Sequence, residues 1–123
     1  MRIEVSIGEI VDKLSILLIK KNKIKDKNKL SNVLNECNYL SKIVFNELKI
    51  EQEDFSDLFF VNEELWNIED KLREKEKNKE FDEEFIGLAR KVYYTNDRRA
   101  DIKKLINTKY KSGFIEEKSY EKY

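Results

Sequence analysis

The stretch that decides the fold runs from Phe55 to Lys77 and reads FSDLFFVNEELWNIEDKLREKEK. Its apolar residues recur every three or four positions, which is the period of an α-helix rather than of a β-strand. It contains neither Pro nor Gly, so no residue within it breaks a helix. The stretch therefore predicts one long amphipathic helix over residues 55–77, with a seam formed by Leu58, Val61, Leu65, Ile68 and Leu72.

The helical period continues on both sides of this stretch. A helix is predicted over residues 7–24, where Ser6 and Glu9 can form a capping box at its start. The apolar residues of 29–48 alternate spacings of three and four, which predicts a second helix with a near-heptad seam. A fourth helix is predicted over residues 83–111.

Three single residues lead to predictions about a helix start, a helix end and a helix contact. Asp54 is expected to be the N-cap of the 55–77 helix. Gly113 is expected to provide the left-handed residue that ends the last helix. Gly87 lies inside that helix, where glycine costs about 1 kcal/mol relative to alanine, so we expect it to mark a close approach of two helices.

Together these elements predict an all-α fold. Short connections favour antiparallel neighbours, so we expect an antiparallel bundle of about four helices or a pair of helical hairpins. Residues 1–5 would form a short extended arm and residues 116–123 an irregular tail. Residues 1–123 are expected to form a single helical domain.

Composition narrows the function classes. The chain carries 25 Lys and Arg and 25 Asp and Glu, so its net charge is zero. A nucleic-acid-binding protein usually shows a basic excess, and we expect no nucleic acid partner. The absence of histidine removes Ser-His-Asp triads and ordinary zinc sites, so neither metal nor cofactor is predicted. The single Cys37 is expected to pack as a small apolar residue.

The chain also shows neither a signal peptide nor an apolar run long enough for a membrane span. A cytoplasmic protein without a membrane partner is therefore expected.

The last predicted helix carries polar residues on a face that is otherwise apolar. Asn96, Arg99 and Lys103 lie between apolar residues at both ends of that face. Polar groups at packed positions need partners. If the third and fourth helices form an antiparallel hairpin, neighbouring residue numbers sum to about 160. That register sets Asn62 level with Arg98 and Trp66 level with Tyr94.

This register predicts a polar pocket between the helices. Arginines would pair with an anion of the phosphate or sugar-phosphate type, amides would orient it, and Trp66 would form a wall. The same charges also fit a plain salt-bridge network, since several are helical neighbours. The sequence leaves both interpretations, an anion-binding pocket and a salt-bridge network, open. The predicted ligand-binding residues are Asn62, Trp66, Glu69, Asp70, Arg73, Asn96, Asp97, Arg98 and Arg99.

The leading functional prediction is a non-catalytic binding or adaptor module. Its site would lie between the first, third and fourth helices and hold an anionic small molecule or a protein partner. A homodimer through an apolar flank is also open.

The alternative is a magnesium-dependent all-α nucleotide pyrophosphohydrolase using Glu63, Glu69, Asp70 and Asp97. Such enzymes carry EExxE and then ExxD, whereas this chain reads EELWNIED and then NDRRAD, so the spacing differs. A helical mutase that binds a dianion is a third reading, and no spacing singles it out.

Four strings together resemble a family of small bacterial all-helical proteins that is catalogued only as a domain of unknown function: VSIGEIVDKLSIL, VNEELWNIEDKLRE, LARKVYYTNDRRADIKKLIN and FIEEKSYEKY. The resemblance covers nearly the whole chain and implies a stand-alone helical protein with no established activity. It also implies that the tail folds back over the groove between the third and fourth helices. This chain departs from the pattern at Leu18, where members tend to have an acid. The pattern residues include Gly8, Glu9, Asp12, Lys13, Asn62, Trp66, Asn96, Arg99, Asn107, Glu117, Lys118 and Tyr120.

Overall fold

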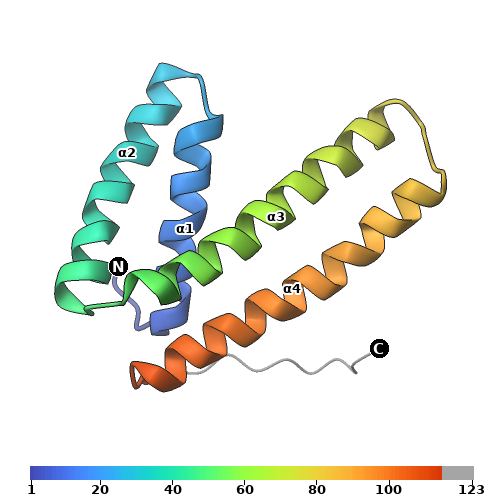
Figure 1. The fold of residues 1–123 in the computed structure, drawn as a ribbon. Helices are drawn as coiled ribbons and strands as arrows, with labels where there is room; N and C mark the ends of the chain where they lie inside the picture. The colour runs from blue at the N-terminus through green and yellow to red at the C-terminus, as the bar shows by residue number, and fades with distance from the viewer. Residues whose placement is uncertain (115–123) are drawn as a thin grey trace.

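The computed structural model describes residues 1–114. Within them lie the helices α1 (Ile7–Lys23), α2 (Lys27–Ser41), α3 (Gln52–Lys77) and α4 (Glu83–Lys109), the short π-helix η1 (Lys42–Glu47), and no strand. Figure 1 shows them as two helical hairpins, α1/α2 and α3/α4, which meet at one end and diverge at the other. The predicted all-α fold is confirmed. The predicted return of Glu117, Lys118 and Tyr120 over a groove lies outside the described residues.

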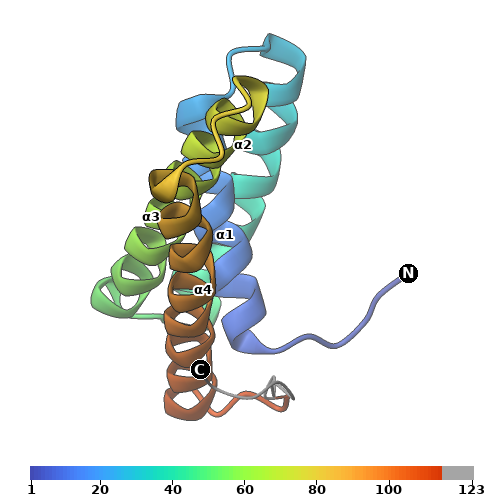
Figure 2. The same cartoon turned by 90° about the vertical axis from the view of Figure 1, so that its right-hand side faces the viewer.

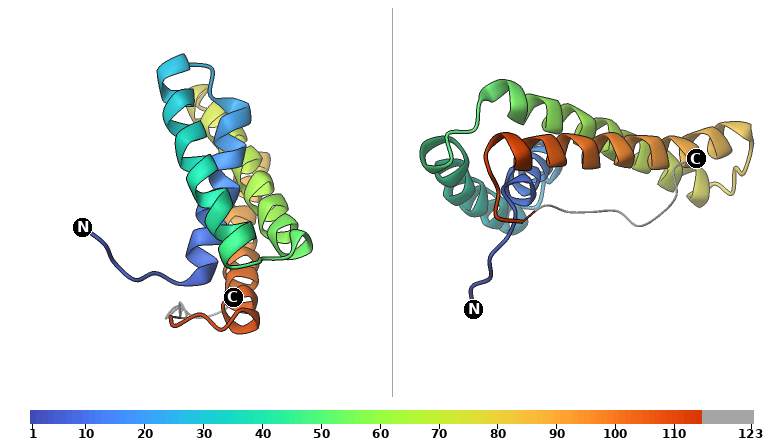
Figure 3. Two further views of the ribbon diagram at one scale, coloured as in Figure 1. Left: turned by 90° about the vertical axis from the view of Figure 1, so that its left-hand side faces the viewer. Right: turned by 90° about the horizontal axis from the view of Figure 1, so that it is seen from below.

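The main core lies where the two hairpins meet. Leu14 of α1, Val44 of η1 and Leu58 of α3 are fully buried there, and Cys37 is buried as predicted. On α3 this core ends at Val61. The longer α3/α4 hairpin continues well past the α1/α2 hairpin, as the right-hand view of Figure 3 shows. The far part of α3/α4 is therefore a projecting pair of helices.

The predicted 29–48 helix is divided in two. It begins at Lys27, where the Asp26 carboxylate accepts a hydrogen bond from the Lys29 amide (3.0 Å). Its last part widens into η1, in which the Leu48 amide donates to the Ile43 carbonyl (2.8 Å). A π-helical turn adds a residue to the turn and so shifts the face that follows it.

Asp54 is not the N-cap of α3, so that prediction is wrong. The helix begins earlier, with Glu51 as its N-cap and no side-chain cap bond from that residue. The hydroxyl of Tyr110 instead accepts a hydrogen bond from the Glu51 amide (2.9 Å) and donates one to the Asp54 carboxylate. Lys109 adds an ion pair to Asp54 (2.8 Å). The end of α4 thus ties down the start of α3.

Gly113 does not provide the left-handed residue that ends α4, which also corrects the prediction. Lys111 does so, with a φ of 57°. The amide of Ser112 then donates to the Asn107 carbonyl (2.8 Å), which is the long hydrogen bond of a Schellman motif. This turn carries the Ser112 hydroxyl to the start of α1, where it accepts a hydrogen bond from the Ile7 amide (3.0 Å).

The close helix approach occurs at Gly8 and not at Gly87. Among residues 1–114, a Cβ at Gly87 would meet nothing within 4 Å, so the expected close approach of two helices at that residue is wrong for the described helices. A Cβ at Gly8 would lie 2.8 Å from the Lys103 carbonyl oxygen and 3.0 Å from Oδ1 of Asn107. Glycine at this position allows the first turn of α1 to lie directly on α4 (Figure 2).

Candidate functional site

The predicted register of the α3/α4 hairpin is confirmed. Three ion pairs join the helices along their length: Lys75 with Asp82 (3.0 Å), Glu64 with Arg98 (3.0 Å) and Asp54 with Lys109 (2.8 Å). The residue numbers of each pair sum to about 160.

A buried polar cluster joins α1 to this hairpin, and we define it as Asp12, Ser15, Asn62, Arg99 and Lys103. Asp12 is only 4% exposed. Its carboxylate accepts two hydrogen bonds from the Arg99 guanidinium, one from Nε to Oδ1 (3.0 Å) and one from Nη2 to Oδ2 (2.5 Å). The Asn62 amide donates to the same Oδ1 (2.9 Å).

The rest of the cluster extends this network to both sides. The Asn62 amide also donates to the Ser15 hydroxyl (2.7 Å), which donates to the Asp12 carbonyl (2.7 Å). The Lys103 ammonium lies 4.0 Å from the Asp12 carboxylate and pairs with the carboxylate of Glu9 (2.5 Å). Two carboxylates thus face two cations. Buried charges are tolerated when paired and hydrogen-bonded in this way, so the cluster fixes the position of α1 on α3 and α4.

Glu9 therefore completes only half of its predicted capping box. Its amide donates to the Ser6 hydroxyl (3.2 Å), while its side chain pairs with Lys103. Asn107 provides a further cap, since its Oδ1 accepts a hydrogen bond from the Gly8 amide (2.7 Å). The Asn107 side-chain amide nitrogen is buried and has no hydrogen-bond partner among residues 1–114.

The nine predicted ligand-binding residues do not form one pocket. Asn62 and Arg99 meet at Asp12, whereas Arg98 is exposed and pairs with Glu64. Arg73 lies eleven residues beyond Asn62 on α3, about 16 Å along the axis. One small ligand cannot reach both ends of such a row. Of the remainder, Trp66, Asn96 and Asp97 are half-buried, and Glu69 and Asp70 are exposed.

The site prediction left out several residues that the cluster uses. The sequence held two signals for these residues. The pattern of the resembling family includes Glu9, Asp12 and Asn107, and the apolar period places Lys103 on the packed face of its helix. Ser15 had no such signal. Its role depends on Asn62 approaching from another helix.

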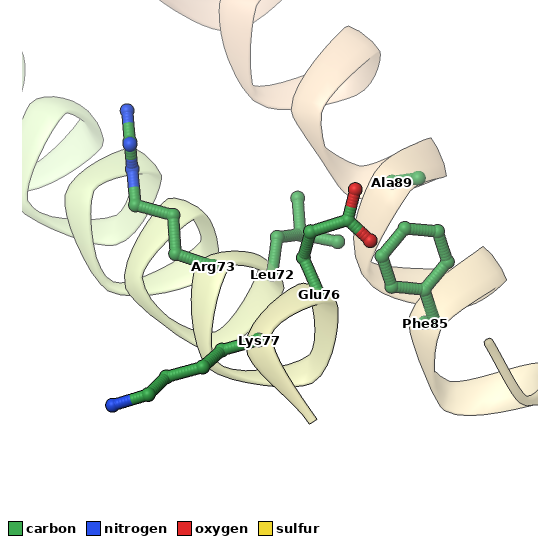
Figure 4. A pocket seen from close by; sticks show the side chains of 6 residues that line it. All are labelled: Leu72, Arg73, Glu76, Lys77, Phe85 and Ala89. Carbon is green, nitrogen blue, oxygen red and sulfur yellow. The ribbon is translucent and has the colours of Figure 1, made fainter. Parts of the chain in front are cut away.

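An open hollow of about 550 Å³ lies farther out between α3 and α4 (Figure 4). Leu72, Phe85 and Ala89 form its apolar part. Figure 4 shows both the Arg73 and the Lys77 side chain extending away from these residues, Arg73 upward and Lys77 toward the lower left. The complete lining is Leu72, Arg73, Glu76, Lys77, Phe85 and Ala89.

The hollow and the buried polar cluster lie on the same side of the hairpin. On α3, Asn62, Trp66, Glu69 and Arg73 follow one another at helical spacing, and on α4 Ala89 precedes Asn96, Arg99 and Lys103 in the same way. We call this the groove side. Helix α1 covers its inner end through Asp12, and the hollow occupies its outer end.

The pKa values of Asp54 and Lys109, where the end of α4 meets the start of α3, are shifted by neighbouring groups. Partial burial opposes ionisation of Asp54, but hydrogen bonds from Lys109 and Tyr110 outweigh it and hold the Asp54 pKa below its ordinary value. The hydrogen bond to Asp54 raises the pKa of Lys109. These shifts describe a structural clamp, and neither group faces the hollow.

Within residues 1–114, no three or more Cys, Asp or Glu side chains are arranged to hold a metal ion. Glu63, Glu69, Asp70 and Asp97 do not come together as such a group in that part of the chain. None of the described helices is both long and apolar enough to cross a membrane.

Comparison with known proteins supports the resemblance in the sequence. No curated protein and no solved structure shows significant similarity to the chain. One family model matches residues 1–123, that of a family of unknown function, DUF6165. The chain therefore belongs to the DUF6165 family, whose function is unknown.

Proposed function

We propose that this protein is a non-catalytic binding module that holds a helical segment of a protein partner on the groove side of its α3/α4 hairpin. The observation that carries the proposal is that only one end of the groove side is covered by another helix of the described chain. Helix α1 occupies the inner end, and beyond it the groove between the same two helices opens into the hollow around Leu72 and Phe85.

The shape of this surface fits a helix better than a small anion. A partner helix can continue along the groove that α1 begins, inserting an apolar side chain against Leu72, Phe85 and Ala89. Of the three arginines predicted to hold an anion, Arg98 is paired with Glu64 and Arg99 with Asp12. A small anion at the hollow would thus meet only one of the three, Arg73.

The charges around the hollow indicate what the partner segment should look like. Arg73 and Lys77 stand beside Glu76, and Glu69 lies one turn before Arg73. A mixed rim favours an amphipathic helix with one or two large apolar residues flanked by both signs of charge. The proposal includes a cytoplasmic location, with which the free thiol of Cys37 is consistent.

Site-specific photo-crosslinking in cells tests this proposal. A photoreactive phenylalanine analogue at Glu76, on the hollow, should give a crosslinked band that mass spectrometry identifies as another protein. The same analogue at Asp57, an exposed position of α3 before the groove opens, is the matched control. The substitution Ala89→Arg, which fills the hollow with a charged side chain, should remove the Glu76 band while circular dichroism stays unchanged.

Equal crosslinking from both positions, or a Glu76 band that survives Ala89→Arg, would contradict the proposal. The small-anion alternative has its own measurement. Inorganic phosphate, compared with an equal ionic strength of chloride, should change the melting temperatures of the wild type and of Arg73→Ala equally, because phosphate stabilises folded proteins without specific binding. A phosphate-specific rise that disappears in Arg73→Ala would favour the anion instead.

A further inference from the structure

The face of α4 that points away from the hollow, which we call its outward side, is a second candidate interaction surface. Gly87 lies two residues after Phe85 and two before Ala89, which places it about half a turn from both on the helix. The exposed residues Glu83 and Glu84 precede it and the exposed residues Arg90 and Lys91 follow it, and these four with Gly87 form the outward side of α4. Glu84 also makes an exposed ion pair with Lys75 of α3 in its own chain (3.6 Å).

Gly87 has no packing role against residues 1–114. It is the fifth residue of the 27-residue helix α4, past the first turn, where glycine costs about 1 kcal/mol relative to alanine. In the part of the chain that the structure describes, a Cβ there would meet nothing within 4 Å, so no neighbouring helix in that part requires the side chain to be missing. Its φ is not positive either. The missing side chain leaves room for the close approach of a backbone from another molecule.

The charges on this side are arranged symmetrically about Gly87. Glu84 lies three residues before it and Arg90 three residues after it, while Glu83 and Lys91 lie four residues before and after. If a second α4 crosses the first in antiparallel direction at Gly87, each acid faces a base of the other copy. The pattern is therefore complementary to itself, which is what a two-fold interface requires.

We propose that two copies of this chain pair through the outward side of α4, antiparallel, with the two Gly87 residues at the crossing point. Each copy contributes Glu83 opposite Lys91 and Glu84 opposite Arg90, so four interchain ion pairs form. The small glycines let the backbones approach closely at the centre. Ile86 and Tyr94, which are 56% and 48% exposed, flank the crossing and lose apolar surface to water.

The position of this surface favours such pairing. It lies on the projecting part of the hairpin, beyond the α1/α2 hairpin (Figure 1), so neither α1 nor α2 stands in the way of a second copy. Only about three turns of each helix overlap around Gly87. An interface of that size is small, so the dimer is in rapid, concentration-dependent exchange with the monomer. Its exposed ion pairs make it weaker at high salt.

This inference goes beyond the proposed function, because it concerns the side of α4 opposite the groove. A dimer built in this way leaves both hollows free and makes the protein bivalent. Each proposal can therefore fail without the other, since crosslinking at the hollow reports one and self-association reports the other.

Analytical ultracentrifugation of the full chain over a wide range of concentration tests the dimer. We expect the wild type to shift reversibly from monomer to dimer. Glu83→Lys and Lys91→Glu should each be monomeric over the same range, because each places like charges opposite one another twice. An equal mixture of the two variants should dimerise again, since every contact between positions 83 and 91 then joins opposite charges.

Two controls make the test specific. Glu74→Lys and Lys71→Glu, at exposed positions of α3, change the net charge by the same amounts and should dimerise as the wild type does. Gly87→Leu should abolish the dimer without lowering the melting temperature measured in dilute solution. A wild type that stays monomeric throughout, single variants that dimerise normally, a mixture that stays monomeric, or a Gly87→Leu dimer would each overturn the proposal.

Discussion

Asp12 of α1 and Arg99 of α4 form a two-point ion pair across 87 residues of sequence, with only 5% of the aspartate side chain exposed. A guanidinium binding a carboxylate through two parallel hydrogen bonds fixes both distance and orientation. Because Asn62 of α3 donates to the same carboxylate, one side chain sets the relation of three helices. The angle between the two hairpins follows from this contact as well as from the apolar core.

Removing the Asp12 carboxylate should therefore destabilise the fold strongly. In Asp12→Ala, Arg99 and Lys103 lose a buried counter-charge, and breaking such a pair from one side costs about 3–5 kcal/mol. The matched control is Glu64→Ala, which removes an exposed ion pair to Arg98 and should cost about 0.2–1 kcal/mol. Urea denaturation of the three proteins measures both values. Similar losses in the two variants would show that the buried pair contributes no more than the surface one.

The two helical glycines of α1 and α4 should respond to alanine in opposite directions. Gly8→Ala forces a Cβ to within 2.8 Å of the Lys103 carbonyl, and overpacking of this kind costs about 1–3 kcal/mol. Gly87→Ala enters open space and should stabilise the monomer by up to about 1 kcal/mol. Thermal unfolding in dilute solution compares them. A Gly8→Ala protein as stable as the wild type would mean that α1 can move off α4 without loss.

The cap that Asn107 provides for α1 should be measurable by itself. Asn107→Ala leaves the buried Gly8 amide without its acceptor, which costs about 1–3 kcal/mol. The neighbouring Thr108→Ala, at an exposed position of the same helix, should change the free energy of unfolding little. Hydrogen exchange of the Gly8 amide gives a local readout, and it should become faster in Asn107→Ala only. Equal protection in both variants would argue against the cap.

The clamp around Asp54 should make stability depend on acid pH. Its pKa in the folded protein lies below the ordinary value of 3.8, so its carboxylate stabilises the fold above that value. The stabilisation is lost as the pH falls through the lower, folded-state pKa. We expect the free energy of unfolding to decline below about pH 4 and Asp54→Asn to remove part of that decline.

Tyr110→Phe should remove a smaller part of the same decline, because it deletes one hydrogen bond to Asp54 and keeps Lys109. Urea midpoints measured at a series of pH values give these slopes. A slope in Asp54→Asn equal to that of the wild type would show that other carboxylates carry the acid sensitivity.

The sequence by itself determined the helices and the way the last two pair. The apolar period predicts which face of each helix is buried. The short connection favours an antiparallel register of α3 and α4 in which residue numbers sum to about 160, which places Arg98 near Asn62 and so within reach of Glu64. Capping preferences and the apolar period also predicted two local features correctly: Ser6 caps α1, and Cys37 is buried. They failed at Asp54 and Gly113, because tertiary contacts to Tyr110 and the turn at Lys111 replaced the expected caps.

Only the tertiary structure decided what the polar residues do. Asp12 looks like a solvent-facing residue when its own helix is considered alone, and it is buried because α3 and α4 bring Asn62 and Arg99 to it. Gly8 and Gly87 are indistinguishable by helix propensity, yet one touches another helix and the other faces open space. Periodicity depends on neighbours a few residues apart, whereas the partner of a buried charge is chosen by helices that meet from distant parts of the chain.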